Sequence, residues 1–81
     1  MYGIITTSKI FVENNILDPS GEPRKGILAF KKKTNAVEEC EELNKIRSAM
    51  KIKQCYSVQK LTPEDIPDWG IILDGKWKKE L

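Results

Sequence analysis

The side chains that most often carry out chemistry are scarce in this chain. It contains no histidine, which is the commonest general base and metal ligand. Its two cysteines, Cys40 and Cys55, form no CxxC pair and are too few for a structural zinc site. The acidic pair Glu38/Glu42 falls at an expected helix start, where carboxylates are favoured for structural reasons. We therefore expect no enzyme activity, no cofactor and no metal site.

Two tryptophans near the C-terminus are the strongest candidates for a binding surface. Trp69 and Trp77 flank an Asp-Gly pair that is typical of a tight type I′ hairpin turn. Tryptophan is enriched among the residues that dominate protein interfaces. We expect a partner-binding surface made of Trp69, Trp77, Lys76 and Lys78, with Lys79 beside it. Trp77 is expected to be the main anchor because it lies four residues from the chain end. The alternative is that both rings close an open end of the core.

The basic residues are a second set of candidates. The net charge is only +2, but charges of one sign occur in blocks along the chain. Basic blocks around Lys31–Lys33 and Lys51–Lys60 would suit contacts with nucleic-acid phosphates, while a solvated loop is the simpler interpretation of the first block. The candidate nucleic-acid-binding residues are Arg24, Lys25, Lys31, Lys32, Lys33 and Lys53.

Part of the chain resembles the second half of an RNA-recognition motif. The resemblance covers about residues 25–60 and is carried by Lys25-Gly26, Phe30, Ala36 and Leu43-Asn44. That family places base-stacking aromatic side chains where this sequence has Ile27 and Ala29. The βαβ unit that opens that fold is also missing here. We therefore attribute the resemblance to a common strand–helix–strand pattern and assign no family.

The elements that must position these residues follow from local sequence patterns. Residues 2–13 are rich in β-branched and aromatic types, which favour a strand with a bend near its centre. Residues 14–25 are dense in turn-forming types and predict an exposed loop. Residues 26–30 and 52–61 predict two further strands. Residues 69–77 predict the hairpin that carries the tryptophans.

One amphipathic helix is predicted over residues 35–50. Asn35 can serve as its N-cap, and Glu38 would complete a capping box. The apolar residues that recur at helical spacing are Ala36, Cys40, Leu43, Ile46 and Met50. Further along, Thr62-Pro63 is typical of a second, short helix start.

These elements predict an α+β fold in one domain, residues 1–81: a small antiparallel sheet of three to five strands with the helix packed on one face. The other face must then be covered by something small, left polar or used for binding. The chain has no apolar run of about 18 residues and no signal peptide, so we expect no membrane association and a cytoplasmic location.

Our leading functional hypothesis is a small non-catalytic protein-binding module, an inhibitor or adaptor of a larger protein or assembly. Accessory proteins of viruses and mobile elements are often of this kind. The first alternative is nucleic-acid binding through the basic blocks. The second is a homodimer formed through an exposed sheet edge.

Overall fold

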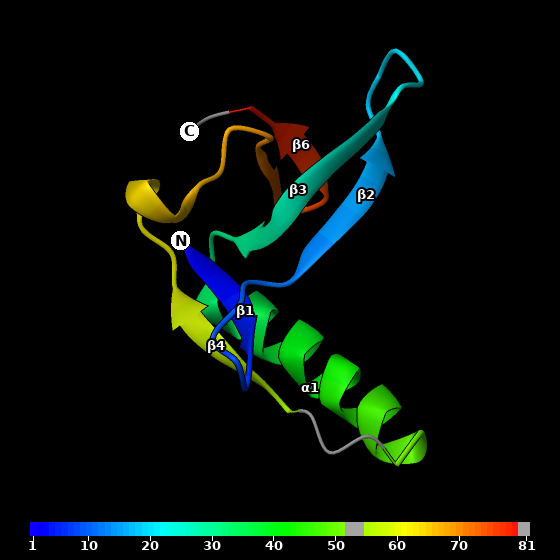
Figure 1. The fold of residues 1–81 in the computed structure, drawn as a ribbon, viewed down its shortest axis with the longest axis vertical. Helices are drawn as coiled ribbons and strands as arrows, with labels where there is room; N and C mark the ends of the chain where they lie inside the picture. The colour runs from blue at the N-terminus through cyan, green and yellow to red at the C-terminus, as the bar shows by residue number, and fades with distance from the viewer. Residues whose placement is uncertain (52–54, 80–81) are drawn as a thin grey trace.

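The computed structural model describes residues 1–51 and 55–79, and in this part of the chain it has six strands and one long helix (Figure 1). The elements are β1 (Tyr2–Thr6), β2 (Glu13–Leu17), β3 (Pro23–Phe30), α1 (Lys33–Ala49), β4 (Tyr56–Lys60), the 3₁₀ turn η1 (Pro63–Asp65), β5 (Ile71–Leu73) and β6 (Lys76–Lys78). The predicted α+β fold is confirmed, with six strands where the sequence suggested three to five.

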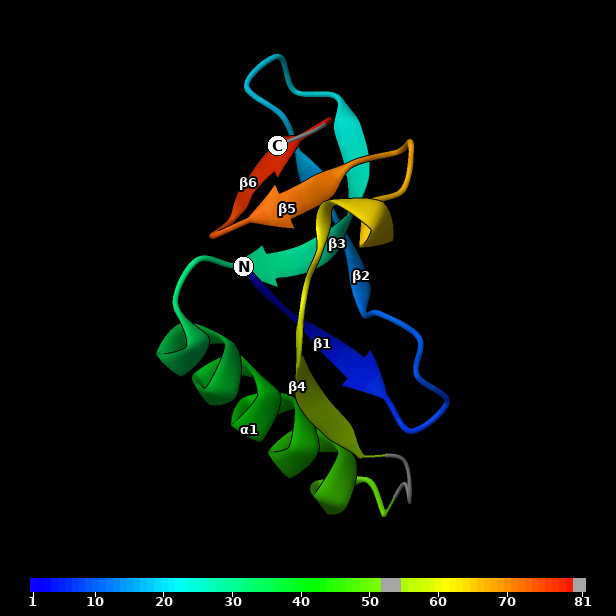
Figure 2. The ribbon, with the colours of Figure 1, turned by 90° about the vertical axis from the view of Figure 1, so that its left-hand side faces the viewer.

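The strands form one sheet around β3. The order is β4-β1-β3-β5-β6, and β2 also pairs with β3. Every strand pair is antiparallel except β3 and β5, which run parallel with Ile27 opposite Ile71. The parallel pair places a C-terminal strand directly beside the first half of the chain (Figure 2). This pairing brings residues 23–27 close to residues 69–79.

The predicted loop over residues 14–25 was wrong at both ends. Only residues 18–22 form the turn, and the flanking residues belong to β2 and β3. The Gly21 N–H donates to the Asp18 carbonyl, and Gly21 has a φ of 84°, so this short turn joins the strands tightly. The two asparagines of β2 are tolerated because they are exposed.

The helix α1 packs mainly on β4, and less on β1 and β3. Ala36 and Cys40 of the predicted apolar face are buried, and Leu43 is half-buried. Ile46 and Met50 are exposed, which the spacing did not predict. The reason is length: about 25 Å of helix lies against strands of about 17 Å, so its last turns extend past the described start of β4.

The predicted helix cap was also wrong. The helix begins at Lys33, two residues before Asn35, and its N-cap residue Lys32 makes no side-chain capping bond. Because β3 ends at Phe30, the chain enters the helix almost at once. Residues 31–35 are exposed, so water can satisfy the first helical N–H groups.

One asparagine fastens the helix to the sheet. The Asn44 side chain accepts a hydrogen bond from the Tyr56 N–H at 2.6 Å and donates one to the Tyr56 carbonyl at 3.0 Å. Arg47 donates to the Tyr56 hydroxyl at 2.9 Å, and its guanidinium lies over the ring. The helix therefore covers the face that carries Tyr56. Ile4, on the neighbouring strand and the same face, is fully buried.

The opposite face has its own apolar cluster. It consists of Ile27, Ala29, Leu61, Ile71 and Leu73, with Met1, Phe11 and Ile66 packed against it. Phe11 comes from the segment between β1 and β2, and a Cβ on Gly3 would lie only 2.9 Å from its ring. Apolar residues from outside the strands, and no second α-helix among the described residues, therefore cover this face. No helix in the described residues has the length and apolarity needed to cross a membrane.

Candidate functional site

The C-terminal hairpin forms as the Asp-Gly pair predicted. Asp74 and Gly75 both have positive φ, at 48° and 84°, which is the type I′ geometry. Ile72 pairs with Trp77 across the hairpin. Trp69 lies outside both strands, in the turn before Gly70. The hairpin therefore brings the two tryptophans together. We expected them on adjacent strands, but only Trp77 lies in a strand.

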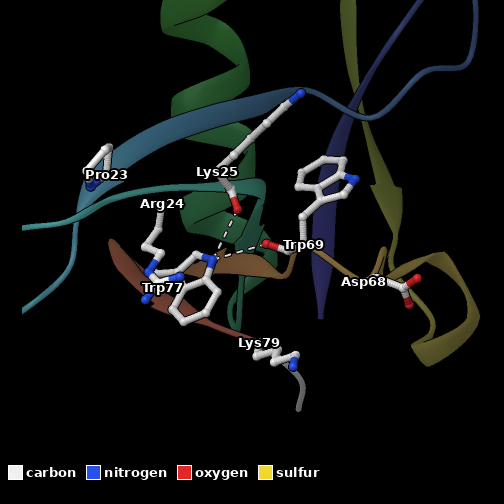
Figure 3. A pocket seen from close by; sticks show the side chains of 7 residues that line it. All are labelled: Pro23, Arg24, Lys25, Asp68, Trp69, Trp77 and Lys79. Carbon is white, nitrogen blue, oxygen red and sulfur yellow. Dashed lines mark hydrogen bonds between the residues drawn. The ribbon is translucent and has the colours of Figure 1, made fainter.

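The indole of Trp77 occupies a gap beside β3. The parallel partner β5 begins opposite Ile27, so among the described residues no strand pairs with the start of β3 on that side. The Trp77 Nε1–H takes the place of a strand donor there, bonding to the Lys25 carbonyl at 3.0 Å and to the Trp69 carbonyl at 3.2 Å (Figure 3). Trp77 is consequently half-buried, with its polar atom satisfied.

Gly70 permits this close arrangement. Its φ is 96°, a conformation that side chains with a Cβ rarely adopt. A Cβ there would lie 2.5 Å from the Lys78 carbonyl oxygen and 2.8 Å from Trp77 Nε1. Only glycine at position 70 therefore allows the turn to lie this close to the Trp77 indole. The preceding residue, Trp69, is held at the surface with 39% of its area exposed.

Around the two indoles the surface forms a cleft of about 290 Å³, which we call the tryptophan cleft. It is lined by Pro23, Arg24, Lys25, Asp68, Trp69, Trp77 and Lys79 (Figure 3). The Arg24 guanidinium lies 4.9 Å from the Trp77 ring centre, and the Lys25 ammonium lies 4.9 Å from the Trp69 ring centre. Such cation–π contacts restrict both rings and both cations.

The cations stacked on the indoles are already paired with acids. Arg24 contacts Asp18 at 2.9 Å and Glu22 at 3.2 Å, and Lys25 contacts Glu13 at 2.9 Å. These acids come from β2 and from the turn that joins it to β3. The cleft therefore presents aromatic surface and bound cations rather than an excess of positive charge.

Asp18 organises the turn that supports Arg24. Its carboxylate accepts hydrogen bonds from the Ser20 hydroxyl at 2.6 Å, from the N–H groups of Ser20 and Glu22, and from Arg24. The Ser20 hydroxyl, and next Arg24, hold the pKa of Asp18 well below its usual range. The carboxylate thus stays ionised, and Arg24 stays oriented over Trp77.

The structure rearranges the predicted partner-binding residues. Trp69 is more exposed than Trp77, the reverse of the order that its position near the chain end suggested. Lys76 and Lys78 alternate with Trp77 along β6, so their side chains leave the opposite face of the sheet. Neither lysine lines the cleft, and Lys79 lines it instead.

The predicted nucleic-acid residues are divided. Arg24 and Lys25 belong to the tryptophan cleft. Lys31, Lys32 and Lys33 follow the other end of β3, about 20 Å from Lys25 along the strand direction. Lys53 lies outside the described residues. The described members of the set therefore do not form one continuous basic surface.

Sequence reasoning missed Pro23 and Asp68 as lining residues. Lys79, expected beside the two rings, does line the cleft. No local signal pointed to Pro23 or Asp68, because only the pairing of β3 with β5 brings them to one site. In the described part of the chain, no three acidic, cysteine or histidine residues are grouped to hold a metal ion. Burial raises the pKa of the Cys40 thiol, which lowers its reactivity.

Comparisons with protein-family models, curated proteins and solved structures found no match for this chain. The geometry of the tryptophan cleft is therefore the basis for assigning a function.

Proposed function

We propose that this protein is a small non-catalytic binding domain that attaches to a larger protein through the tryptophan cleft and acts there as an inhibitor or adaptor. The observation that supports this most is the exposed Trp69 indole at the rim of a cleft, where the Trp69 backbone carbonyl is held by a hydrogen bond from the half-buried Trp77. Large aromatic residues in such settings are the side chains that contribute most at protein interfaces.

The cleft is arranged before any partner arrives. The Trp69 carbonyl is bonded to Trp77, the next residue is a glycine in a fixed turn, and the Trp69 ring lies against Lys25. A side chain that is already ordered loses little conformational entropy on binding, and this favours affinity. Leu17, 70% exposed beside the paired Pro23, extends the apolar surface on the same hairpin.

A protein partner fits the charges better than a nucleic acid does. Arg24 and Lys25 are both engaged by acids of the β2–β3 hairpin, and Asp68 adds a further negative charge to the cleft. Nucleic-acid affinity depends largely on cations that are free to neutralise phosphates. The one feature in favour of nucleic acid is the pair of cations stacked on indoles, an arrangement related to base-stacking platforms.

Homodimerisation through a sheet edge is a weaker proposal, because each edge carries a feature that hinders pairing. On β4, Asn44 occupies both backbone groups of Tyr56. On β2, the Asn15 N–H donates to the side chain of Asn14 at 2.8 Å. On β6, two of the three residues are lysines. Side chains that occupy edge donors, and edge lysines, are common means of preventing self-association.

Capture from an extract of the native host, with three immobilised proteins, tests the proposal. The proteins are the wild type, Trp69→Ala and, as a control, Ile46→Ala, which removes an exposed apolar side chain on α1. Quantitative mass spectrometry should find a partner that the wild type and the control retain and that Trp69→Ala loses at least about tenfold. Far-UV circular dichroism confirms that all three proteins are folded.

Two outcomes would count against it. Equal recovery by all three proteins would show that the cleft is not the binding surface. Submicromolar binding of the wild type to single-stranded RNA at physiological salt, with a steep salt dependence, would instead favour nucleic acid. We expect only weak binding to RNA or DNA.

A further inference from the structure

The outer edge of β6 is open, and its backbone geometry follows from the hairpin turn. β6 is the last strand in the sheet order, with β5 as its only strand neighbour among the described residues (Figure 2). In a two-residue hairpin the residues that flank the turn, here Leu73 and Lys76, form a hydrogen-bonded pair. The next pair, Ile72 and Trp77, is therefore of the non-bonded type. The backbone N–H and C=O of Trp77 thus point out of the sheet edge.

The charges along this edge belong to two lysines of β6. Lys76 and Lys78 project from the same face, about 7 Å apart along the strand. Neither forms an ion pair with any residue of the described chain, in contrast to Arg24 and Lys25. The edge therefore offers, on one face, two cations that no described residue pairs with and, on the other, the Trp77 ring that leads into the tryptophan cleft.

The two lysines determine which kind of strand can pair with the open edge of β6. If a second copy of β6 added antiparallel and centred on Trp77, Lys76 would lie opposite Lys78 of the other copy at two places. Like charges directly opposite each other on neighbouring strands are destabilising, whereas opposite charges are favourable. The lysines thus disfavour self-pairing and favour an acidic strand.

We propose that β6 receives an extended acidic segment of the partner protein as an added strand. Two acidic residues of that segment lie opposite Lys76 and Lys78, and the apolar residue between them faces the Trp77 side and the tryptophan cleft. Strand addition takes affinity from the main chain and specificity from alternate side chains. This inference rests on the proposed protein-binding function and names the chemistry of the partner.

A charge-exchange titration tests the inference. The probes are a capped seven-residue peptide of alternating valine and glutamate, and a matched peptide of valine and lysine, added to isotope-labelled protein and followed by NMR. The glutamate peptide should slow hydrogen exchange of the Trp77 amide and shift the Lys76 and Lys78 resonances. The double variant Lys76→Glu/Lys78→Glu should bind it about tenfold more weakly and should bind the lysine peptide instead. Lys31→Glu/Lys32→Glu, at the far end of β3, should bind as the wild type does.

Equal binding of both peptides, or no change at Trp77 with millimolar glutamate peptide, would overturn the inference. The same variants separate it from the proposed function. If Trp69→Ala loses the captured partner while Lys76→Glu/Lys78→Glu retains it, the added strand is wrong and the cleft stands. If neither variant loses the partner, both proposals are wrong.

Discussion

Replacing Trp77 by phenylalanine would remove the indole N–H from the gap beside β3 while leaving an aromatic ring on β6. That N–H donates to the Lys25 and Trp69 carbonyls at 3.0 and 3.2 Å. A net hydrogen bond contributes about 0.5–1.5 kcal/mol, and because water can reach these carbonyls we take about 1 kcal/mol. The smaller ring loses about 1 kcal/mol of half-buried apolar contact. Trp77→Phe should therefore lower the free energy of unfolding by about 2 kcal/mol, or the melting temperature by roughly 10 °C.

Urea denaturation followed by far-UV circular dichroism measures this loss without relying on tryptophan emission. Trp69→Phe is the matched control, because the Trp69 indole is more exposed and its N–H bonds to no described residue. It should cost less than about 1 kcal/mol. If Trp77→Phe were as stable as the wild type, or if Trp69→Phe were the more damaging change, Trp77 would not be the residue that holds the cleft together.

Two further predictions concern the supports of the fold. Asn44→Ala should lower the free energy of unfolding by about 1–3 kcal/mol, because the side-chain amide of Asn44 bonds both backbone groups of Tyr56. A loss below about 0.5 kcal/mol in urea melts would mean that water replaces the amide and would contradict this prediction. Asp18→Asn should destabilise the protein at pH 7 and matter less in acid. Ser20 and Arg24 depress the pKa of Asp18, so the stabilisation is present above about pH 4 and is lost as the pH falls toward the folded value. The urea midpoints of the wild type and Asp18→Asn, measured at pH 7 and at about pH 2.5, test this prediction. A difference between the two midpoints that is as large at about pH 2.5 as at pH 7 would contradict it.

The features predicted correctly from the sequence are those with a local cause. Asp74-Gly75 forms the type I′ turn because these two residues tolerate the positive φ that the turn requires. Thr62-Pro63 starts the short η1 turn, where the Asp65 carboxylate accepts hydrogen bonds from the Thr62 N–H and hydroxyl. Ala36 and Cys40 are buried because helical spacing places them on the face that meets the sheet.

Boundaries were harder to predict because neighbouring elements compete for the same residues. The residues around Asn14 and Asn15 have turn chemistry, yet pairing with β3 draws them into a strand. Asn35 is a good helix cap, yet the short connection after β3 starts the helix before it. In both places tertiary contacts outweigh a local preference of less than about 1 kcal/mol.

The amino-acid sequence by itself determined the α+β class, the helix, the hairpin and the scarcity of catalytic side chains. Only the tertiary structure decided which residues form the tryptophan cleft. Parallel pairing of β3 with β5 places Lys25 beside Trp69 and Trp77, more than forty residues away in the chain, and leaves the gap that the Trp77 indole fills. Because Trp77 fills this gap and bonds the Trp69 carbonyl, Trp77 is the half-buried ring and Trp69 the exposed one. No local pattern encodes this, because the partner that an indole N–H finds depends on where a distant strand happens to begin.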